Sequence, residues 1–478
     1  MDDRNRTYTS PLETRWASSA MRELFSRQKK HATWRRLWLA LAEAQHELGL
    51  PAVKPEHLAA MGEHLDDIDF TAADAYEAKF RHDVMAHIHA FGDLVGEARG
   101  VIHLGATSQF VNCNTDMILA REALGLLRRR LVNVIDALAS FAAEHRALPC
   151  LGFTHFQPAQ ATTVGKRAAL WCADFLRDLR DLEYRLDALA FRGAKGTTGT
   201  QASYLALFDG DHEKVRRLDH LVAEKMGFDR IATITGQTYT RKVDAEIAQV
   251  LAGLAASVHK FANDIRLLAH RKEIEEPFAA TQVGSSAMAY KRNPMRCERA
   301  TGLARYLMDI SVSPLHTAAE QWFERTLDDS ANKRLATSEA FLLADSILLI
   351  TLNVARGLVV YPARIDAALR EELPFMASEN ILMAAVAAGG DRQALHERIR
   401  QHSLAAAEQV KLHGKPNDLL DRLRGDEAFA SVDLDALLDP RDFIGRSAEQ
   451  VDEFLATDVA PVRSRCADLL GDDSDLRV

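Results

Sequence analysis

Apolar residues recur every three or four positions over long stretches of the chain. One series, with spacings of 3, 4, 3, 4 and 3, comprises Leu124, Leu127, Leu131, Val134, Leu138 and Phe141. A second series, with spacings of 4, 3, 4, 3, 4 and 3, comprises Ile247, Leu251, Leu254, Val258, Phe261, Ile265 and Leu268. Each pattern predicts a helix with one apolar stripe that packs at a shallow angle against its neighbours.

The helix around the first series is predicted to be unusually long. If Thr115–Arg146 is helical throughout, it extends about 45–50 Å, because an α-helix rises ~1.5 Å per residue. This is more than twice the length of an ordinary globular helix. Helices of this length need one another to bury their stripes, so the pattern predicts a central bundle from about Ser108 to Val360.

The most apolar segment runs from Ala340 to Val360 and is interrupted by Asp345, Asn353 and Arg356. A charge in the middle of a bilayer is costly, so we interpret this segment as a core helix and expect no membrane span. Its apolar residues point around the whole helix, which must therefore be buried on all sides. This favours association of the bundle with other copies, but burial under the chain's own terminal segments is the alternative.

Shorter helices are predicted on both sides of the bundle. Thr33–Leu48 is amphipathic and ends at Gly49, whereas Tyr361 and Pro362 break the chain before a series of short helices. Convincing alternating strands are absent. The pattern predicts an all-α fold with three helical domains, at residues 1–107, 108–360 and 361–478.

Composition and charge narrow the class of protein. The chain has 478 residues, of which 47% are hydrophobic and 27% charged, as in a globular protein. Its net charge of −9 does not favour nucleic acid as a partner. An odd number of cysteines, five, without a CxxC pair fits a reduced, intracellular protein. The polar N-terminus has no secretory apolar region, so we expect a cytoplasmic protein.

Several familiar chemical motifs are missing from the sequence. No GxGxxG follows a strand, and GxxxxGK[ST], HExxH and GxSxG are absent, so nucleotide-fold cofactors and common hydrolase triads have no support. His82, His87 and His89 do not share one face of a helix, and we expect no metal. Gly193, Gly196 and Gly199 are better interpreted as a structural turn than as a phosphate-binding loop.

Two segments carry candidate chemistry. In Gly152–Gln160, His155 precedes a predicted helix whose first turn can hold Pro158. In residues 284–295, a small-residue stretch ends in Lys291, Arg292 and Asn293 before a helix, which forms a receptor for carboxylate. A histidine satisfied at a helix N-terminus and an ordinary flexible surface loop with solvated charges are the respective alternatives.

The loop Gly-Ser-Ser-Ala-Met-Ala-Tyr-Lys-Arg-Asn-Pro at residues 284–294 resembles the signature of the fumarase/aspartase superfamily, GSSxMPxKxNP. Other segments narrow the resemblance to the adenylosuccinate lyase family, in the branch that includes the animal enzymes. These segments are Ser10–Arg15, Arg81–His87, His103–Ser108, Thr154–Gln160 and Gln321–Ser330. The similarity extends from about residue 8 to the last helices.

The resemblance implies a lyase that cleaves adenylosuccinate to AMP and fumarate in purine biosynthesis. It also implies cleavage of the succinylated aminoimidazole carboxamide ribotide (SAICAR) to AICAR and fumarate. Members of the family use no metal or organic cofactor and are homotetramers, in which the bundles join and three subunits build each site. Two alternatives remain: another superfamily lyase, such as argininosuccinate lyase or fumarase, and a non-catalytic helical protein related to lens crystallins.

The resemblance also implies roles for individual residues. Ser285 is the implied general base, although the neighbouring Ser286 is not excluded, and His155 is the general acid. Glu298 is the implied partner of His155, and Lys291 binds the succinyl carboxylate, while His82 assists at the charged groups of the substrate. The implied substrate-binding residues are Arg15, Trp16, Arg81, Asp83, Thr107, Ser108, Thr154, Gln237, Asn293, Arg299, Arg325, Ser330 and Arg334.

Two positions depart from the family pattern. Trp16 stands where the family commonly has tyrosine, and an indole donates one hydrogen bond but accepts none. Ala289 replaces the proline of the signature, which frees φ and raises the entropy of the open loop. The sequence therefore predicts a loop that is costlier to order than in its relatives.

Overall fold

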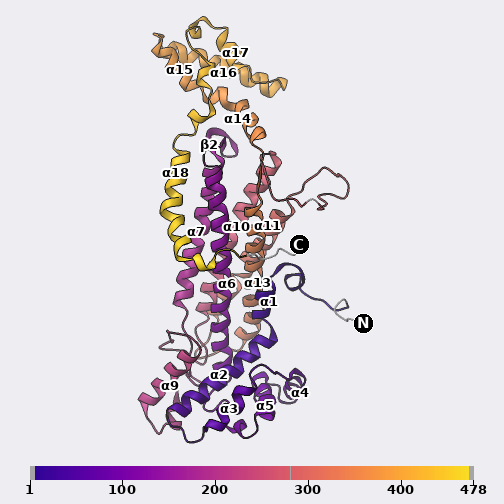
Figure 1. Cartoon of the computed structure of the whole chain (residues 1–478), viewed down its shortest axis with the longest axis vertical. Coiled ribbons are helices and arrows are strands. Elements are labelled where there is room, and N and C mark those ends of the chain that lie inside the picture. Colours follow the sequence, from indigo (N-terminus) through magenta and orange to yellow (C-terminus); the bar gives the residue numbers. More distant parts are fainter. Residues whose placement is uncertain (1–5, 280, 473–478) are drawn as a thin grey trace.

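The computed structural model describes residues 6–279 and 281–472, and its centre is a bundle of long helices (Figure 1). Helix α6 contacts α7 and α13, and α10 contacts α7, α11 and α13, so the helices enclose a common core. The predicted all-helical bundle is confirmed. Its members are α6 (Ser108–Glu144), α7 (Val164–Ala188), α10 (Lys242–His270), α11 (Met295–Ile310) and α13 (Asp328–Arg356), with the short α12 (Ser313–Ala319) between the last two.

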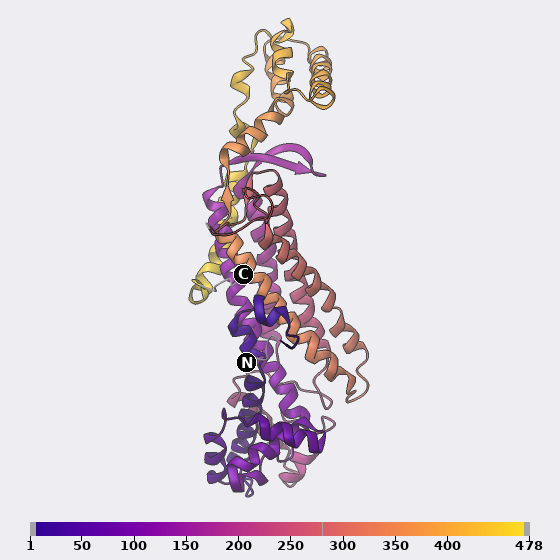
Figure 2. The same ribbon diagram turned by 90° about the vertical axis from the view of Figure 1, so that its right-hand side faces the viewer.

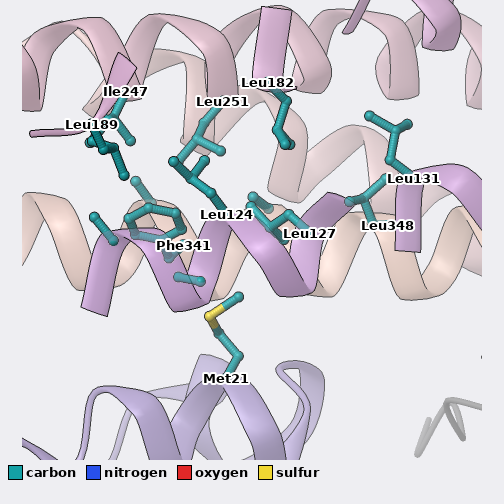
Figure 3. Close-up of a cluster of buried hydrophobic side chains, with 14 of the residues drawn as sticks. Met21, Leu124, Leu127, Leu131, Leu182, Leu189, Ile247, Leu251, Phe341 and Leu348 are labelled. Carbon is teal, nitrogen blue, oxygen red and sulfur yellow. The ribbon is translucent and has the colours of Figure 1, made fainter. Parts of the chain in front are cut away.

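The two apolar series line the inner faces of α6 and α10. Every residue of both series is at most 8% exposed, and Leu124, Leu127 and Leu251 meet in the centre of the core (Figure 3). Helix α6 begins seven residues earlier than predicted, at Ser108, and its 37 residues extend about 55 Å. The length of α6 sets the distance between the predicted site residues that lie at its two ends.

Helix α13 is buried by other elements of its own chain. This corrects the argument that its apolar surface favours association of the bundle with other copies. Besides α6, α10 and α11, it contacts two N-terminal elements, η2 (Leu12–Trp16) and α1 (Ser19–Leu24). The helix is long and apolar enough to cross a membrane by composition, but 78% of its most apolar window is buried inside the protein. The periodicity required burial but did not say what supplies it. The buried side chains include Phe341, Leu342, Leu343, Ile347, Leu348, Leu349 and Ile350.

The remaining N-terminal helices gather at one end of the bundle (Figure 1). The predicted helix after Thr33 begins six residues earlier, because the Ser26 hydroxyl caps it by accepting from the Lys29 N–H at 3.1 Å. His87 belongs to the core, where its ring stacks on His31 at 3.7 Å and burial lowers its pKa to about 4. These elements are α2 (Arg27–Glu47), α3 (Pro55–Glu63), α4 (Phe70–Phe80), α5 (Asp83–Val95) and η3 (Gly96–Gly100). Two helices from the segment between α7 and α10 lie beside them, because α9 (His212–Lys225) contacts both α2 and α8 (Ala202–Leu207).

The C-terminal part of the chain divides in two. Helices α14 (Pro362–Met376), α15 (Ser378–Ala387), α16 (Arg392–His413) and α17 (Leu419–Arg424) lie beyond the opposite end of the bundle, where α15–α17 share a small core of their own. The chain then returns along α6 and α7, and Val451 and Val462 join the main core (Figure 2). The domain boundaries at 107/108 and 360/361 stay predictions. The returning elements are α18 (Ser447–Phe454), η7 (Leu455–Val459) and α19 (Ala460–Arg465), preceded by η4 (Glu427–Phe429), η5 (Asp435–Leu437) and η6 (Pro440–Phe443) and followed by η8 (Ala467–Leu469).

The segment around His155 is a β-hairpin, so two expectations were wrong: strands are present, and Pro158 is not in a helix. Strands β1 (Pro149–Thr154) and β2 (Gln157–Thr163) pair antiparallel, and Thr154 faces Gln157 across the turn. His155 and Phe156 form the turn with φ of 53° and 54°, the left-handed values of a type I′ turn. Neither glycine nor asparagine occupies these positions, so the usual hairpin signal was missing. A second, two-residue pairing joins β3 (Ile274–Glu275) to β4 (Val359–Val360).

Candidate active site

The predicted site residues form three separate groups in the single chain. The "N-terminal cluster" comprises His82, Asp83, Thr107, Ser108, Gln237, Arg325 and Arg334, flanked by Arg81 and Ser330. The "loop cluster" comprises Arg15, Trp16, Ser285, Lys291, Asn293, Glu298 and Arg299. The "hairpin pair" is Thr154 and His155.

In the N-terminal cluster, hydrogen bonds join residues that are far apart in the sequence. The Gln237 side-chain amide donates to the Thr107 hydroxyl at 3.2 Å and accepts from Arg325 Nη1 at 3.1 Å. His82 caps α5 by accepting from the Met85 N–H at 3.3 Å. Its other ring nitrogen, Nε2, lies 3.3 Å from the hydroxyl oxygen of Ser108, at the start of α6. The ends of α5, α6, α10 and α13 therefore bring the cluster together.

The charges beside this cluster are concentrated around Asp83. Arg334 Nη2 donates to the Asp83 carboxylate at 2.8 Å. Burial works against the charge, but the hydrogen bond from Arg334 and the charge of Lys30 lower the pKa of Asp83. Burial and the nearby Arg334 lower the pKa of Lys30, which lines the same 230 Å³ cavity as Arg334 and Lys333. Arginine and lysine together offer an anionic ligand several donors.

The signature loop runs between β3 and α11 and places its serine over backbone amides. The Ser285 hydroxyl oxygen accepts hydrogen bonds from the N–H groups of Ala287 and Met288, at 3.3 and 3.1 Å. Two amides directed at one oxygen favour negative charge on that oxygen. Ser286 is exposed and has no side-chain hydrogen bond among the described residues.

Both ends of the loop are fixed. Glu276 caps α11 by accepting from the backbone N–H groups of Arg296 and Cys297, at 3.0 and 2.8 Å. The Asn293 side-chain amide donates to the carbonyl oxygen of Gly284 at 2.8 Å and closes the base of the loop. Arg292 donates to the Tyr361 hydroxyl at 3.3 Å. These hydrogen bonds attach the two ends of the loop to the rest of the protein.

The alanine that departs from the family signature lies in a turn of this loop. The Lys291 N–H donates to the Met288 carbonyl at 3.0 Å, which places Ala289 at the second position of the turn, where proline is favoured. We expect Ala289→Pro to stabilise the ordered loop by ~0.5–1 kcal/mol. Steady-state kinetics should show KM lowered about two- to fivefold. Unchanged KM and turnover would contradict this expectation.

Glu298 and Arg299 lie in the first turn of α11, directly after the loop. Glu298 is exposed, whereas Arg299 is half-buried. Burial and the charge of Arg15, which comes from η2, lower the pKa of Arg299. The resulting pair of cations beside a helix N-terminus favours the binding of an anion.

Trp16 points inward in the single chain. Its indole packs against the main core, and its Nε1 is buried without a hydrogen-bond partner among the described residues. A tryptophan donor in this position does not replace the hydroxyl of a tyrosine at the surface. The role of Trp16 in substrate binding stays a prediction.

His155 lies at the tip of the β1–β2 hairpin and is exposed. The hairpin is anchored on the bundle at its base, where the Arg271 guanidinium lies 4.6 Å from the centre of the Phe153 ring. Ring contact between Phe153 and Phe156, at 5.7 Å, supports the turn. The hairpin therefore carries His155 at its exposed tip, pointing away from its own chain, while the base of the hairpin is fixed on the bundle.

The N-terminal cluster is far from the other two groups. Ser108 begins the 37-residue α6, and the hairpin follows its end, so His82 and His155 lie on the order of 50 Å apart. Gln237 precedes the 29-residue α10, and the signature loop follows the end of this helix. Gln237 and the loop are therefore about 40 Å apart. No single copy of the chain brings all three groups to one small substrate.

Several residues near the predicted groups were missed from the sequence. Gln109 lies beside Arg325 and, with its amide oxygen turned toward the guanidinium, accepts from Nη1 at 2.5 Å. Its position directly after Thr107 and Ser108 was a usable signal. Lys30, Arg241 and Asp329 were also missed. Lys30 and Arg241 lie outside the family segments, and Asp329 lies within Gln321–Ser330 but was given no role, because only the fold brings the three residues near the site.

Comparison with known families assigns the class. A family model described as "Lyase" matches residues 10–308, and one described as "Adenylosuccinate lyase C-terminus" matches residues 374–454. A solved structure of a fumarate lyase from a Mesorhizobium species has a TM-score of 0.78 at 25% identity, covering 94% of this chain and 100% of that one. The helical bundle with its signature loop is thus the fold of a lyase.

Two relatives narrow the assignment further. The adenylosuccinate lyase of Saccharomyces cerevisiae is 52% identical over 456 residues, which cover 95% of each chain. The adenylosuccinate lyase of Schistosoma mansoni is 47% identical, covering 98% of this chain and 99% of that one. The chain belongs to the adenylosuccinate lyase family and is an enzyme of the lyase class.

Proposed function

We propose that this enzyme cleaves adenylosuccinate to AMP and fumarate, and SAICAR to AICAR and fumarate. The observation that carries the proposal is the Ser285 hydroxyl oxygen under two backbone amides, within a loop that ends in Lys291 and Asn293. Near full-length similarity to adenylosuccinate lyases supports the choice of substrate.

The reaction is a β-elimination. A base removes the proton from the succinyl carbon next to a carboxylate, and the electrons of this C–H bond form the new C=C bond. The C–N bond breaks, its electrons remain on the nitrogen, and an acid supplies the proton that this nitrogen needs. Charge grows on the carboxylate as the proton leaves, so cations and N–H donors placed there lower the barrier.

Ser285 acts as the base in this proposal. A serine hydroxyl removes a carbon-bound proton only as an alkoxide, so its negative charge must be stabilised. The Ala287 and Met288 amides supply that stabilisation, and Lys291 adds a positive charge once the loop closes over the substrate. Lys291 and Asn293 also bind the carboxylate on which charge develops.

His155 supplies the proton to the departing nitrogen. An acid must hold its proton before it acts, and an unperturbed histidine is mostly neutral at pH 7. Glu298 is the proposed partner that orients the ring for this transfer. We place this contact between subunits, with His155 and Glu298 supplied by different copies of the chain.

The N-terminal cluster binds the charged ends of the substrate. Arg325 and Arg334 present guanidinium groups that bind phosphate or carboxylate in a bidentate manner. The His82 ring and the Ser108 hydroxyl add neutral donors. Arg334 is paired with Asp83, which keeps its side chain oriented.

The active enzyme is proposed to be a homotetramer with sites shared between subunits. A separation of about 40–50 Å between the N-terminal cluster and the other two groups supports sharing, because these groups meet only when copies combine. Large apolar side chains on the outer faces of the bundle supply contact surface. Leu170, Tyr184, Leu267, Tyr306 and Leu335 are between 42% and 69% exposed. Five buried, unpaired cysteines support a reducing compartment, and we place the enzyme in the cytoplasm.

The test is an ultraviolet assay of the purified enzyme with adenylosuccinate, followed by detection of fumarate. Release of stoichiometric AMP and fumarate supports the proposal. Turnover of argininosuccinate or malate in place of adenylosuccinate would assign another lyase of the superfamily. Absence of turnover with all three would leave a non-catalytic helical protein as the explanation.

A further inference from the structure

We propose that Arg241 and Asp329, a buried ion pair with no assigned role, are positioning residues that hold Arg325 and Gln237 in their substrate-binding arrangement. This inference rests on the proposed function, because it concerns how the same site is kept in shape. Neither residue of the pair reaches the surface, so the pair acts through its neighbours and does not touch the substrate.

The ion pair is short and enclosed. Arg241 Nε donates to Asp329 Oδ2 at 2.5 Å, and the two side chains are each 2% exposed. Arg241 lies directly before α10 and Asp329 in the first turn of α13, so the pair joins the starts of two bundle helices. Gln321 strengthens this junction, because its side-chain oxygen accepts from the Arg241 backbone N–H at 2.9 Å.

Both site residues are attached to this junction. Arg325 Nη2 lies 4.0 Å from Asp329 Oδ1, and Arg325 Nη1 donates to Gln237 Oε1 at 3.1 Å. Gln237 in turn donates from its backbone to the carbonyl of Glu324 at 3.0 Å. Residues 235–241 and 320–329 are therefore bound to each other at several points around the two side chains. A displacement of Asp329 would be transmitted to Arg325 directly and to Gln237 through Arg325.

A glycine-rich turn closes the other side of this arrangement. Gly193, Gly196 and Gly199 have φ between 81° and 84°, which agrees with a structural turn. A Cβ added at Gly199 would collide with the carbonyl oxygen of Thr235. Arg192, which is fully buried, donates to the carbonyl of Gly236 at 3.2 Å. The backbone beside Gln237 thus has little freedom to move away from the ion pair.

Stability alone is a weak reason for such a pair. Removing two charges from water costs several kcal/mol per ion, and apolar residues of similar volume often stabilise a core as well or better. Asp329 Oδ1 also has no hydrogen-bond partner among the described residues, although it is buried. An oxygen left unsatisfied beside the Arg325 guanidinium attracts that cation and restricts where it lies. This is the behaviour expected of a positioning group.

Asp329→Asn tests the inference, because it removes the charge and keeps the shape. The matched control is Asp345→Asn on the same helix, where Arg130 Nε lies 2.8 Å from the Asp345 carboxylate and both side chains are at most 3% exposed. Both variants lose a buried charge partner, so both should unfold at a lower temperature. Only Asp329→Asn should raise KM for adenylosuccinate, by about tenfold or more, because small displacements of binding groups are costly.

A second variant keeps the inference testable if Asp329→Asn fails to fold. Arg241→Lys keeps the positive charge but loses the Nε contact, and we expect a smaller rise in KM with little change in kcat. Calorimetric titration with AMP, which needs no turnover, should show weakened binding in the same order. Equal KM values for wild type, Asp329→Asn and Arg241→Lys would overturn the inference. If the wild-type enzyme itself released no fumarate, the proposed function would fail instead.

Discussion

Ser285→Ala and His155→Ala should each lower turnover of adenylosuccinate by at least about 10³-fold. In the proposed mechanism Ser285 removes the proton and His155 supplies the proton to the departing nitrogen, so each substitution removes one of these two groups. Ser285 lies in a loop and His155 at an exposed hairpin tip, so neither substitution disturbs the main core. Stopped assays for fumarate measure the loss, and the melting temperature should stay within a few degrees of the wild-type value.

The neighbouring Ser286 supplies the matched control for the base. Its hydroxyl has no described hydrogen bond, whereas that of Ser285 accepts from two amides. Ser286→Ala should therefore retain turnover within a fewfold of wild type. The reverse result, with Ser286→Ala inactive and Ser285→Ala active, would transfer the role of base to Ser286.

Mixing two inactive variants should restore activity if sites are shared. His82→Asn keeps a helix N-cap residue at the start of α5, while it removes the imidazole. His82 and His155 lie on the order of 50 Å apart in one chain, so the proposed shared site takes them from different subunits. In equal, randomly assembled mixtures of His82→Asn and His155→Ala, about one quarter of the sites receive both intact residues. Refolding the variants together should thus recover about a quarter of wild-type activity.

A different pair of variants controls for this result. His82 and Arg334 lie in the same N-terminal cluster of one chain, so mixtures of His82→Asn with Arg334→Ala always leave one of the two groups defective. That mixture should stay at the level of the separate variants. Recovery in both mixtures, or in neither, would contradict the assignment of the groups to different subunits.

Much of the fold could be predicted, because long apolar repeats leave few alternatives. The stripes on α6 and α10 required a bundle, and each of their residues is buried. The hairpin was missed because its turn uses His155 and Phe156 in left-handed conformations without the residues that normally mark such a turn. The pattern of apolar residues also could not predict that η2 and α1 bury α13, because periodicity identifies an apolar face but not its partner.

The residues of the candidate site likewise divide into those that could be predicted from the sequence and those that could not. Family motifs identified Ser285, His155 and Lys291, because these residues stand in segments with distinctive local composition. Arg241 lies outside these segments, and Asp329 stands in Gln321–Ser330 without an assigned role, since a buried ion pair is recognised only when both partners are seen together. Gln109 was missed although it directly follows two predicted residues.

By itself, the sequence determined the helical bundle and the family of lyases to which the chain belongs, and it identified the small-residue loop as a candidate site. These depend on local order along the chain: the spacing of apolar residues and the identity of neighbouring side chains. Only the tertiary structure decided that His155 projects on a hairpin and that Arg241 and Asp329 form a buried ion pair beside Arg325. It also decided that the N-terminal cluster lies about 40–50 Å from the other two groups. The physical reason is that the lengths of helices give the distance between two residues in space only when the directions of those helices are known.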